Sequence, residues 1–273
     1  MALTINTNIA AMDAARNLNN TEGMLGTAMQ RLSSGLRINS AADDVAGYAI
    51  SQSLQSQVNG LGQAENNSLD AVAMAQTAQG ALNDVNTMLQ RVRELGVEYA
   101  NGTTSEEDKT AIEGEVKDLN EEIERVSKTT EFNGVKLLEG EEEVKFQVGA
   151  NDKETIGVKT VELYKEIEKL IEPAKFGEKI EAGTGLKELT EAIAKTSEIA
   201  GEYGAAQDRI QFAQSNLEVY SQNLTSAVSA FDDVNIATEM TNFTKDQVLQ
   251  QAGVSILTQA NQLPDAALHL LEG

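Results

Sequence analysis

The sequence lacks several residue types on which protein chemistry most often depends. Its 273 residues include no cysteine, no tryptophan, two prolines and one histidine. Without cysteine there is no disulfide framework, no cysteine-ligated zinc or iron–sulfur site and no thiol nucleophile. A serine–histidine pair or a histidine metal site would depend on His269 alone. The composition therefore points away from an enzyme or a metalloprotein, and we expect no catalytic residue, no metal and no cofactor.

Basic residues are also scarce, with 21 Lys and Arg against 43 Asp and Glu and a formal net charge of −22. This charge repels phosphate groups, which argues against nucleic acid and anionic lipid as partners. No segment reaches the ~18 consecutive apolar residues of a membrane-spanning helix. Residues 1–8 lack the basic and apolar regions of a secretory signal. We therefore expect no membrane insertion, and if the chain leaves the cytosol it does so by a route that does not use such a signal.

The negative charge is concentrated in the middle of the chain. Residues 101–200 carry 25 acidic and 14 basic residues, whereas residues 1–100 carry 9 and 5, and residues 201–273 carry 9 and 2. A strongly charged middle is typical of solvated surface. The weakly charged ends indicate surfaces that are covered rather than left to solvent.

Long helices are indicated by seam residues that recur at alternating steps of three and four. One seam crosses residues 54–99 without a skip, and its alanine-rich centre allows a partner backbone to approach closely. Its members are Leu54, Gln57, Leu61, Ala64, Ser68, Ala71, Ala75, Ala78, Leu82, Val85, Leu89, Val92, Gly96 and Tyr99. A second seam shifts phase after Asp232-Asp233. Its members are Ile210, Ala213, Leu217, Tyr220, Leu224, Ala227, Phe231 and Val234, then Leu249, Ala252, Ile256, Ala260 and Leu263.

The two ends of the chain frame a short β-prone region. Near the N-terminus, Ala11, Leu18, Leu25 and Leu32 repeat every seven residues, with Ile5, Ile9 and Met12 ahead of them. A further helix is predicted at about 104–128, with a weak capping signal from Ser105 and Asp108. The β-prone runs are Val135–Leu138, Val144–Val148 and Thr155–Lys159. Two short helices are expected after them, at residues 160–171 and 186–200.

These patterns predict a mainly α fold. The N- and C-terminal arms form a long antiparallel helical bundle or coiled coil, and a small β hairpin element lies at the centre.

Several local sequences at both ends of the chain resemble bacterial flagellin. The matching segments are Met1–Ala10, Leu32–Ser51, Leu89–Leu95, Phe132–Leu138, Ala205–Ile210 and Asn261–Pro264. The resemblance covers about residues 1–149 and 203–271, and the motifs follow one another in the family's order. Only about 50 residues separate the two matching parts, so the chain is similar to a short flagellin without large variable outer domains.

The resemblance implies a structural subunit that polymerises into the flagellar filament for swimming motility. It implies that residues 1–43 and 235–273 are arms of an inner-tube coiled coil. Residues 44–234 would form a rod-like helical bundle, with a β hairpin near 132–160 and a short helical insertion at 160–200. The candidate inner-tube assembly residues are Ile5, Ile9, Leu18, Leu25, Leu32, Leu249, Ile256 and Leu263.

The same resemblance implies a set of partners and a location. The partners are other copies of the chain, the filament cap, the hook-junction proteins and an export chaperone on the C-terminal arm. The location is an extracellular flagellum, reached through the flagellar type III export apparatus. The sequence leaves open whether the filament is external or periplasmic.

A vertebrate Toll-like receptor that senses flagellin binds the region of the family that matches Leu89–Leu95. The candidates on that surface are Gln90, Arg91, Leu95, Glu98, Ile112 and Glu115. Glu98 stands where the receptor-active pattern commonly has Gln. The resemblance implies that these residues also face the axial interface between subunits, so we interpret assembly as their main role and recognition by a host as incidental.

Three other functions compete with the filament subunit. A hook-associated junction protein has similar ends, although the full run from Leu32 to Ser51 favours flagellin. An enzyme would need a constellation of catalytic groups, and the adjacent pairs Asp43-Asp44 and Asp232-Asp233 point in different directions on a helix. Those pairs are more typical of a solvated face or a helix-end contact. A generic coiled-coil adaptor would leave both terminal signatures unexplained.

Overall fold

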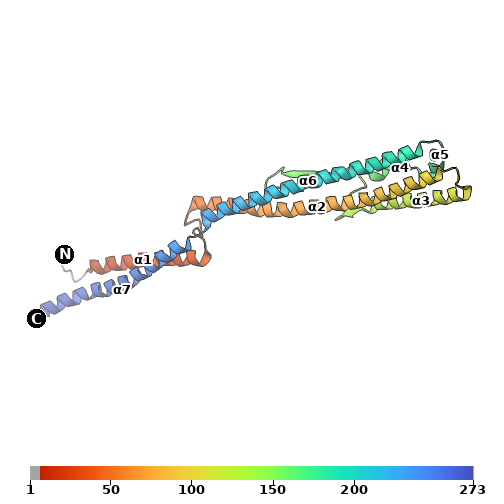
Figure 1. Cartoon of the computed structure of the whole chain (residues 1–273). Coiled ribbons are helices and arrows are strands. Elements are labelled where there is room, and N and C mark those ends of the chain that lie inside the picture. Colours follow the sequence, from red (N-terminus) through yellow and green to blue (C-terminus); the bar gives the residue numbers. More distant parts are fainter. Residues whose placement is uncertain (1–6, 273) are drawn as a thin grey trace. The chain divides into compact units, whose positions relative to one another are not determined.

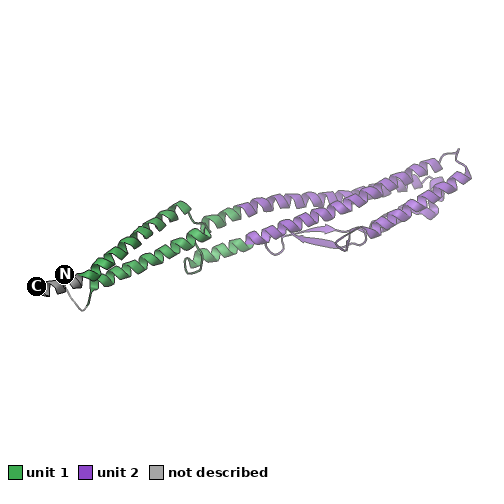
Figure 2. Cartoon of the chain, turned by 90° about the horizontal axis from the view of Figure 1, so that it is seen from below, with its two compact units in different colours: residues 1–56, 223–273 green, residues 57–222 purple. Residues whose placement is uncertain are grey.

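The chain folds into long helices and two small sheets (Figure 1). This computed structural model describes the backbone of residues 7–272 and the side-chain surroundings of residues 7–262. Two compact units are distinguished, the first formed by residues 1–56 with 223–273 and the second by residues 57–222 (Figure 2). The mainly α fold that the sequence predicts is confirmed.

The elements alternate between very long and very short. In chain order they are α1 (Ile9–Ser34), α2 (Val45–Tyr99), α3 (Glu106–Thr129), β1 (Glu131–Phe132), β2 (Val135–Lys136), β3 (Glu143–Gln147), β4 (Thr155–Lys159), α4 (Leu163–Ile171), the 3-10 turn η1 (Pro173–Lys175), α5 (Phe176–Glu181), α6 (Gly185–Asp232) and α7 (Ile236–Glu272).

The core of the second unit lies along α2. From residue 61 to residue 99, every seam position predicted for this helix is buried. Residues from 71 to 89 of this seam share one apolar cluster with buried residues of α3, α4, β4 and α6. Ala71, Ala75 and Ala78 have no exposed surface, so the neighbouring elements pack closely against the backbone of α2.

Helix α6 is longer than the sequence indicates. The expected short helix at 186–200 is wrong, because these residues are the first part of a continuous helix of 48 residues. Its buried positions are Leu189, Ala192, Thr196, Ile199, Tyr203, Ala206, Ile210 and Leu217. They extend the predicted seam upstream at the same three-and-four steps. Tyr220 and Phe231 were expected in that seam, but they lie outside it, 44% and 41% exposed.

Two local signals fix the ends of α3. Ser105 and Asp108 form the predicted capping box, in which each side chain accepts a hydrogen bond from the other residue's backbone N–H, at 3.2 Å. After α3, Asn133 and Gly134 take left-handed φ values of 48° and 81°. This turn closes the β1–β2 hairpin, where Phe132 pairs with Val135.

The second hairpin pairs β3 with β4, in a register that places Val144 opposite Val158. The central β element predicted as one hairpin thus consists of two antiparallel two-stranded sheets. The stretch between α4 and α6 contains η1 and α5. Phe176 at the start of α5 packs edge-on against Tyr99, with ring centroids 5.8 Å apart.

In the first unit, α1 and α7 lie side by side and antiparallel (Figure 1). The predicted stripe Ala11, Leu18, Leu25 and Leu32 is half-buried along α1. Asn8 begins this helix by accepting a hydrogen bond from the Ala11 N–H, and its Nδ2 donates to the Ala260 carbonyl at 2.7 Å. Ile5 lies outside the described residues.

The seam of α7 differs from the predicted one. Leu249 and Ile256 of the predicted seam are 44% and 60% exposed, and among the described members of that set only Ala260 is buried. The positions buried on α7 are Glu239, Asp246 and Ala260, which share a seven-residue spacing with half-buried Gly253. A Cβ on Gly253 would lie 3.3 Å from Cδ1 of Leu18, so glycine allows the helices to approach closely. The side chain of Leu263 is outside the described part.

We expect Tyr203→Phe to destabilise the second unit. The buried Tyr203 hydroxyl donates a hydrogen bond of 2.8 Å to the Leu137 carbonyl, and burial raises the pKa of this phenol. Removing the hydroxyl leaves that carbonyl with only the 3.3 Å hydrogen bond from the Val161 N–H, and the loss of one hydrogen bond costs about 0.5–1.5 kcal/mol. Urea unfolding followed by circular dichroism measures the loss. The control is Tyr220→Phe on the same helix, which is exposed and should leave the midpoint unchanged; equal midpoints for both variants would contradict the prediction.

Candidate assembly and recognition surfaces

The signature segment Leu32–Ser51 forms the connection between α1 and α2. Gly35 ends α1 in a left-handed conformation with φ 74°, and its N–H donates to the Arg31 carbonyl at 2.9 Å. The next residues pair with the end of α6, since the Arg37 N–H donates to the Asp232 carbonyl at 2.5 Å and the Val234 N–H donates to the Gly35 carbonyl at 2.9 Å. The segment therefore joins three helix ends within the first unit.

The paired carboxylates of this segment, Asp43 and Asp44, accept hydrogen bonds from nearby backbone N–H groups. Asp43 accepts hydrogen bonds from the N–H groups of Asn39 and Ser40, at 3.1 and 2.9 Å, and from the Ser40 hydroxyl. These bonds, led by that from the Ser40 side chain, hold the pKa of Asp43 below its usual range. Asp44 caps α2 by accepting from the Gly47 N–H at 2.9 Å. Both are helix-end contacts, one of the two readings the sequence offered.

The second pair, Asp232 and Asp233, lies where α6 gives way to α7. The Asp232 carboxylate accepts a hydrogen bond from the buried Ser51 hydroxyl of α2, and Asp233 accepts one from Ser229. Asn235 then caps α7 by accepting from the Thr238 N–H at 3.1 Å. This pair, like the first, orders a helix end.

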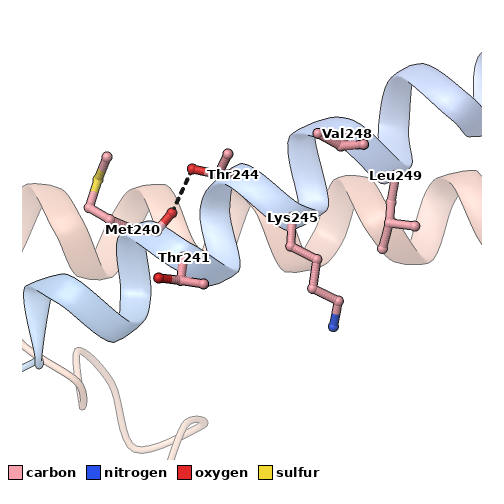
Figure 3. A pocket seen from close by; sticks show the side chains of 6 residues that line it. All are labelled: Met240, Thr241, Thr244, Lys245, Val248 and Leu249. Carbon is pink, nitrogen blue, oxygen red and sulfur yellow. Dashed lines mark hydrogen bonds between the residues drawn. The ribbon is translucent and has the colours of Figure 1, made fainter.

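The surface of the first unit exposes several large apolar side chains. Its exposed large side chains include Ile9 (63%), Met29 (56%), Val248 (60%) and Ile256 (60%). Figure 3 shows one stretch of this face on α7, lined by Met240, Thr241, Thr244, Lys245, Val248 and Leu249. The Thr244 hydroxyl donates to the Met240 carbonyl at 2.8 Å, so it is satisfied within the helix. The surface therefore presents mainly carbon and sulfur, beside one ammonium group.

The inward face of α7 is acidic where it meets α1. Glu239 and Asp246 are 8% and 7% exposed, and Arg31 of α1 lies 3.7 Å from the Glu239 carboxylate. With Asn20 and Asn242, these side chains line a polar groove between the two helices. The sequence reading missed both acids, although their seven-residue spacing with Gly253 and Ala260 was the signal available.

The predicted receptor and axial-interface residues fall into an exposed and a buried group. Gln90, Arg91, Glu98 and Glu115 are exposed on α2 and α3 of the second unit. Arg91 contacts the Glu115 carboxylate at 2.9 Å and that of Glu94 at 3.4 Å. The hydrogen bond to Glu115 raises the pKa of the Arg91 guanidinium, so the side chain stays charged and is oriented across the two helices.

Leu95 and Ile112 belong to the buried group. They are 2% and 6% exposed and lie in an apolar cluster with Val92, Val116 and Phe176. In this structure the two residues support the surface that Arg91 and Glu115 present, and they do not themselves reach solvent.

Other kinds of site find little support in the described part of the chain. Residues 7–262 hold no group of three or more His, Asp or Glu side chains arranged to bind a metal ion. No described helix is both long and apolar enough to cross a membrane.

Comparison with known proteins identifies the family of the chain. The model described as the bacterial flagellin N-terminal helical region matches residues 5–143, and that of the C-terminal helical region matches residues 186–271. The chain belongs to the bacterial flagellin family. It is a structural filament protein and not an enzyme, as the sequence predicts.

Relatives match the chain from end to end. A flagellin of Halalkalibacterium halodurans is 42% identical over 98% of this chain and the whole of the relative. The flagellar filament 33 kDa core protein of Treponema phagedenis is 36% identical over 98% of this chain and its own full length. A solved putative flagellar hook-associated protein from Vibrio parahaemolyticus covers 70% of this chain and all of its own, with a TM-score of 0.61 and 14% identity, which shows a shared fold alone.

We expect Gly47→Ala to loosen the α1–α2 connection of this flagellin. A Cβ at this position would lie 2.5 Å from Oδ2 of Asp44 and 2.7 Å from Cδ1 of Ile38. The clash displaces the helix cap, which is worth ~1 kcal/mol. Amide hydrogen exchange across residues 36–47 should accelerate by about fivefold to tenfold. The control is Gly62→Ala in the same helix, where a Cβ meets nothing within 4 Å; faster exchange at 36–47 in that variant would refute the cap argument.

Proposed function

We propose that this chain is the repeating subunit of an extracellular bacterial flagellar filament, exported through the flagellar type III apparatus and used for swimming motility. Residues 1–43 and 235–273 would form its inner-tube arms, and residues 44–234 its outer bundle. The observation that carries the proposal is the outward apolar face of α1 and α7 in a chain that belongs to the flagellin family. Such a face needs a cover, and identical neighbours supply one in a polymer.

The distribution of charge supports the same arrangement. Within the first unit the basic residues are Arg16, Arg31, Arg37 and Lys245, and large exposed apolar side chains occur on several sides of its helices. The second unit holds most of the chain's charged residues and therefore suits contact with water. A head-to-tail or helical contact between copies that does not close produces a filament.

The same face suits the further partners of the proposal. Before assembly, the α7 surface around Val248 and Leu249 would be masked by an export chaperone on the C-terminal arm, which prevents premature association. The filament cap would meet this unit as the chain is added, and the hook-junction proteins would meet it at the filament base.

A hook-junction role is the second candidate, and the fold shared with the Vibrio parahaemolyticus protein is the observation in its favour. Full-length identity to flagellins favours the filament. Electron microscopy after seeding purified protein with filament fragments separates the two roles. A filament subunit grows long filaments in proportion to added protein, whereas a junction protein stops at short assemblies. Only short assemblies at high protein concentration would refute the filament role.

We expect Ile256→Asp to abolish or strongly weaken filament growth. Ile256 is 60% exposed on α7, and a carboxylate buried there without a partner costs several kcal/mol. The protein concentration needed for seeded growth should rise at least about tenfold. The matched control is Gln251→Asp, which adds the same charge at an exposed polar position of the same helix. Equal effects from both substitutions would show that net charge, rather than the apolar face, limits assembly.

Recognition by a flagellin-sensing Toll-like receptor is a second proposal for the exposed group around Arg91. The Arg91 guanidinium, with 48% of its side chain exposed, presents unused N–H groups beside Glu115. Arginine in such a position is a frequent centre of binding energy at protein interfaces. The buried Leu95 and Ile112 would act only by supporting the helices.

Arg91→Ala should therefore raise the half-maximal concentration in a receptor reporter assay by about tenfold, using monomeric protein. The thermal midpoint should change little, because exposed ion pairs contribute ~0–1 kcal/mol. Arg125→Ala is the control, since Arg125 is also paired with a glutamate, Glu122, and lies outside the candidate surface. Unchanged signalling by Arg91→Ala would remove the proposal and leave the filament role intact.

A further inference from the structure

The six methionines whose surroundings the structure describes are divided between two environments. Met74 and Met88 lie in the second unit, the former 1% exposed and the latter half-buried against the apolar cluster around α2. Four others lie in the first unit and are all about half exposed. They are Met12 (58%), Met24 (52%), Met29 (56%) and Met240 (46%).

The four exposed methionines lie at different places on the surface of the α1–α7 pair. Met12 and Met29 lie off the predicted stripe of α1, Met24 lies at the polar groove between the two helices, and Met240 lies on the stretch of α7 in Figure 3. A methionine is flexible and polarizable, so it adapts to the irregular surface of a neighbouring copy. The same exposure leaves each thioether open to dissolved oxidants until a neighbour covers it.

We propose that these four methionines are oxidation sites that control incorporation of the chain into the filament, and the proposal rests on the filament role argued above. A peroxide transfers one oxygen atom to the thioether. An S–O bond forms, the O–O bond breaks, sulfur is oxidised by two electrons and the peroxide is reduced to water. The product is a methionine sulfoxide, whose polar oxygen replaces a sulfur lone pair on the apolar face.

Oxidation acts on assembly because of desolvation. A neighbouring copy that packs against Met12, Met29 or Met240 removes water from the side chain. For a thioether this is favourable, whereas a sulfoxide loses hydrogen bonds that the apolar surroundings do not replace. The modification should therefore block addition of free chains, and chains already covered in the filament should resist it. A dithiol-dependent methionine sulfoxide reductase reverses the step, because the dithiol supplies two electrons and the oxygen leaves as water.

The first experiment locates the modification. Monomeric protein treated with hydrogen peroxide should gain about 16 Da at each of Met12, Met24, Met29 and Met240, while Met74 in the same molecules stays unmodified and serves as an internal reference. Preformed filaments under the same treatment should be oxidised at these four sites at least about tenfold more slowly. Equal rates in monomer and filament, or modification of Met74 as fast as of Met240, would overturn the proposal.

The second experiment tests the effect of oxidation on assembly. For each protein, the readout is the ratio of seeded filament growth after peroxide treatment to seeded filament growth before it. For the unmodified sequence this ratio should fall about tenfold and recover after treatment with the reductase. The variant carrying Met12→Leu, Met24→Leu, Met29→Leu and Met240→Leu should keep a ratio near one, and Met74→Leu alone should behave like the unmodified sequence. An undiminished ratio in the unmodified sequence overturns the inference, whereas failure of untreated protein to grow on seeds counts against the filament role.

If the fourfold variant fails to grow, single substitutions replace it. Met240→Leu alone should then reduce the loss after peroxide, and mass spectrometry should show that the remaining loss follows oxidation of the other three sites. Loss of growth that does not correlate with sulfoxide content at any of the four would also overturn the inference.

Discussion

The second unit depends on one constraint, the unbroken burial of a single stripe along α2 from residue 61 to residue 99. Each buried position along this stripe must be filled by a side chain of a size that the opposing element permits. Alanines at 71, 75 and 78 admit close backbone approach, and Leu82, Val85 and Leu89 fill the wider space beside α4 and the hairpins. A helix of 55 residues gains most of its stability from such a stripe and little from its own hydrogen bonds.

Where the sequence failed within that unit, the cause was buried polarity. Residues 186–200 belong to the same long helix as Ile210, yet Thr196 and Tyr203 interrupt the apolar pattern. Both are buried because their polar atoms are satisfied, the Thr196 hydroxyl by the Ala192 carbonyl at 2.9 Å and the Tyr203 hydroxyl by the Leu137 carbonyl. The second of these bonds joins residues 66 positions apart, so no local pattern predicts it. By contrast, the Ser105–Asp108 cap and the Asn133–Gly134 turn use neighbouring residues and were predictable.

The sequence indicated which segments of the chain carry the candidate surfaces. It did not indicate which face of each helix is exposed. The terminal signatures identified both arms, yet they did not show which face of α7 meets α1. Periodicity placed Leu249 and Ile256 in one seam and did not indicate what covers it. In the structure Glu239 and Asp246 are buried beside α1, and Leu249 and Ile256 are exposed. A periodic apolar pattern reports that a face is covered and does not say whether another element of the same chain or another molecule covers it.

The apolar side chains that are fully buried between α1 and α7 are small. Ala14, Ala28 and Ala260 contribute one methyl group each to the contact, and a buried CH₂ group is worth only ~0.8 kcal/mol. Ordering a residue costs roughly 1.5 kcal/mol. The pair therefore gains little from these three methyl groups, and large apolar side chains such as Ile9, Val248 and Ile256 remain exposed. In the filament proposed above, neighbouring copies would cover those side chains, which would couple folding of the arms to addition to the polymer.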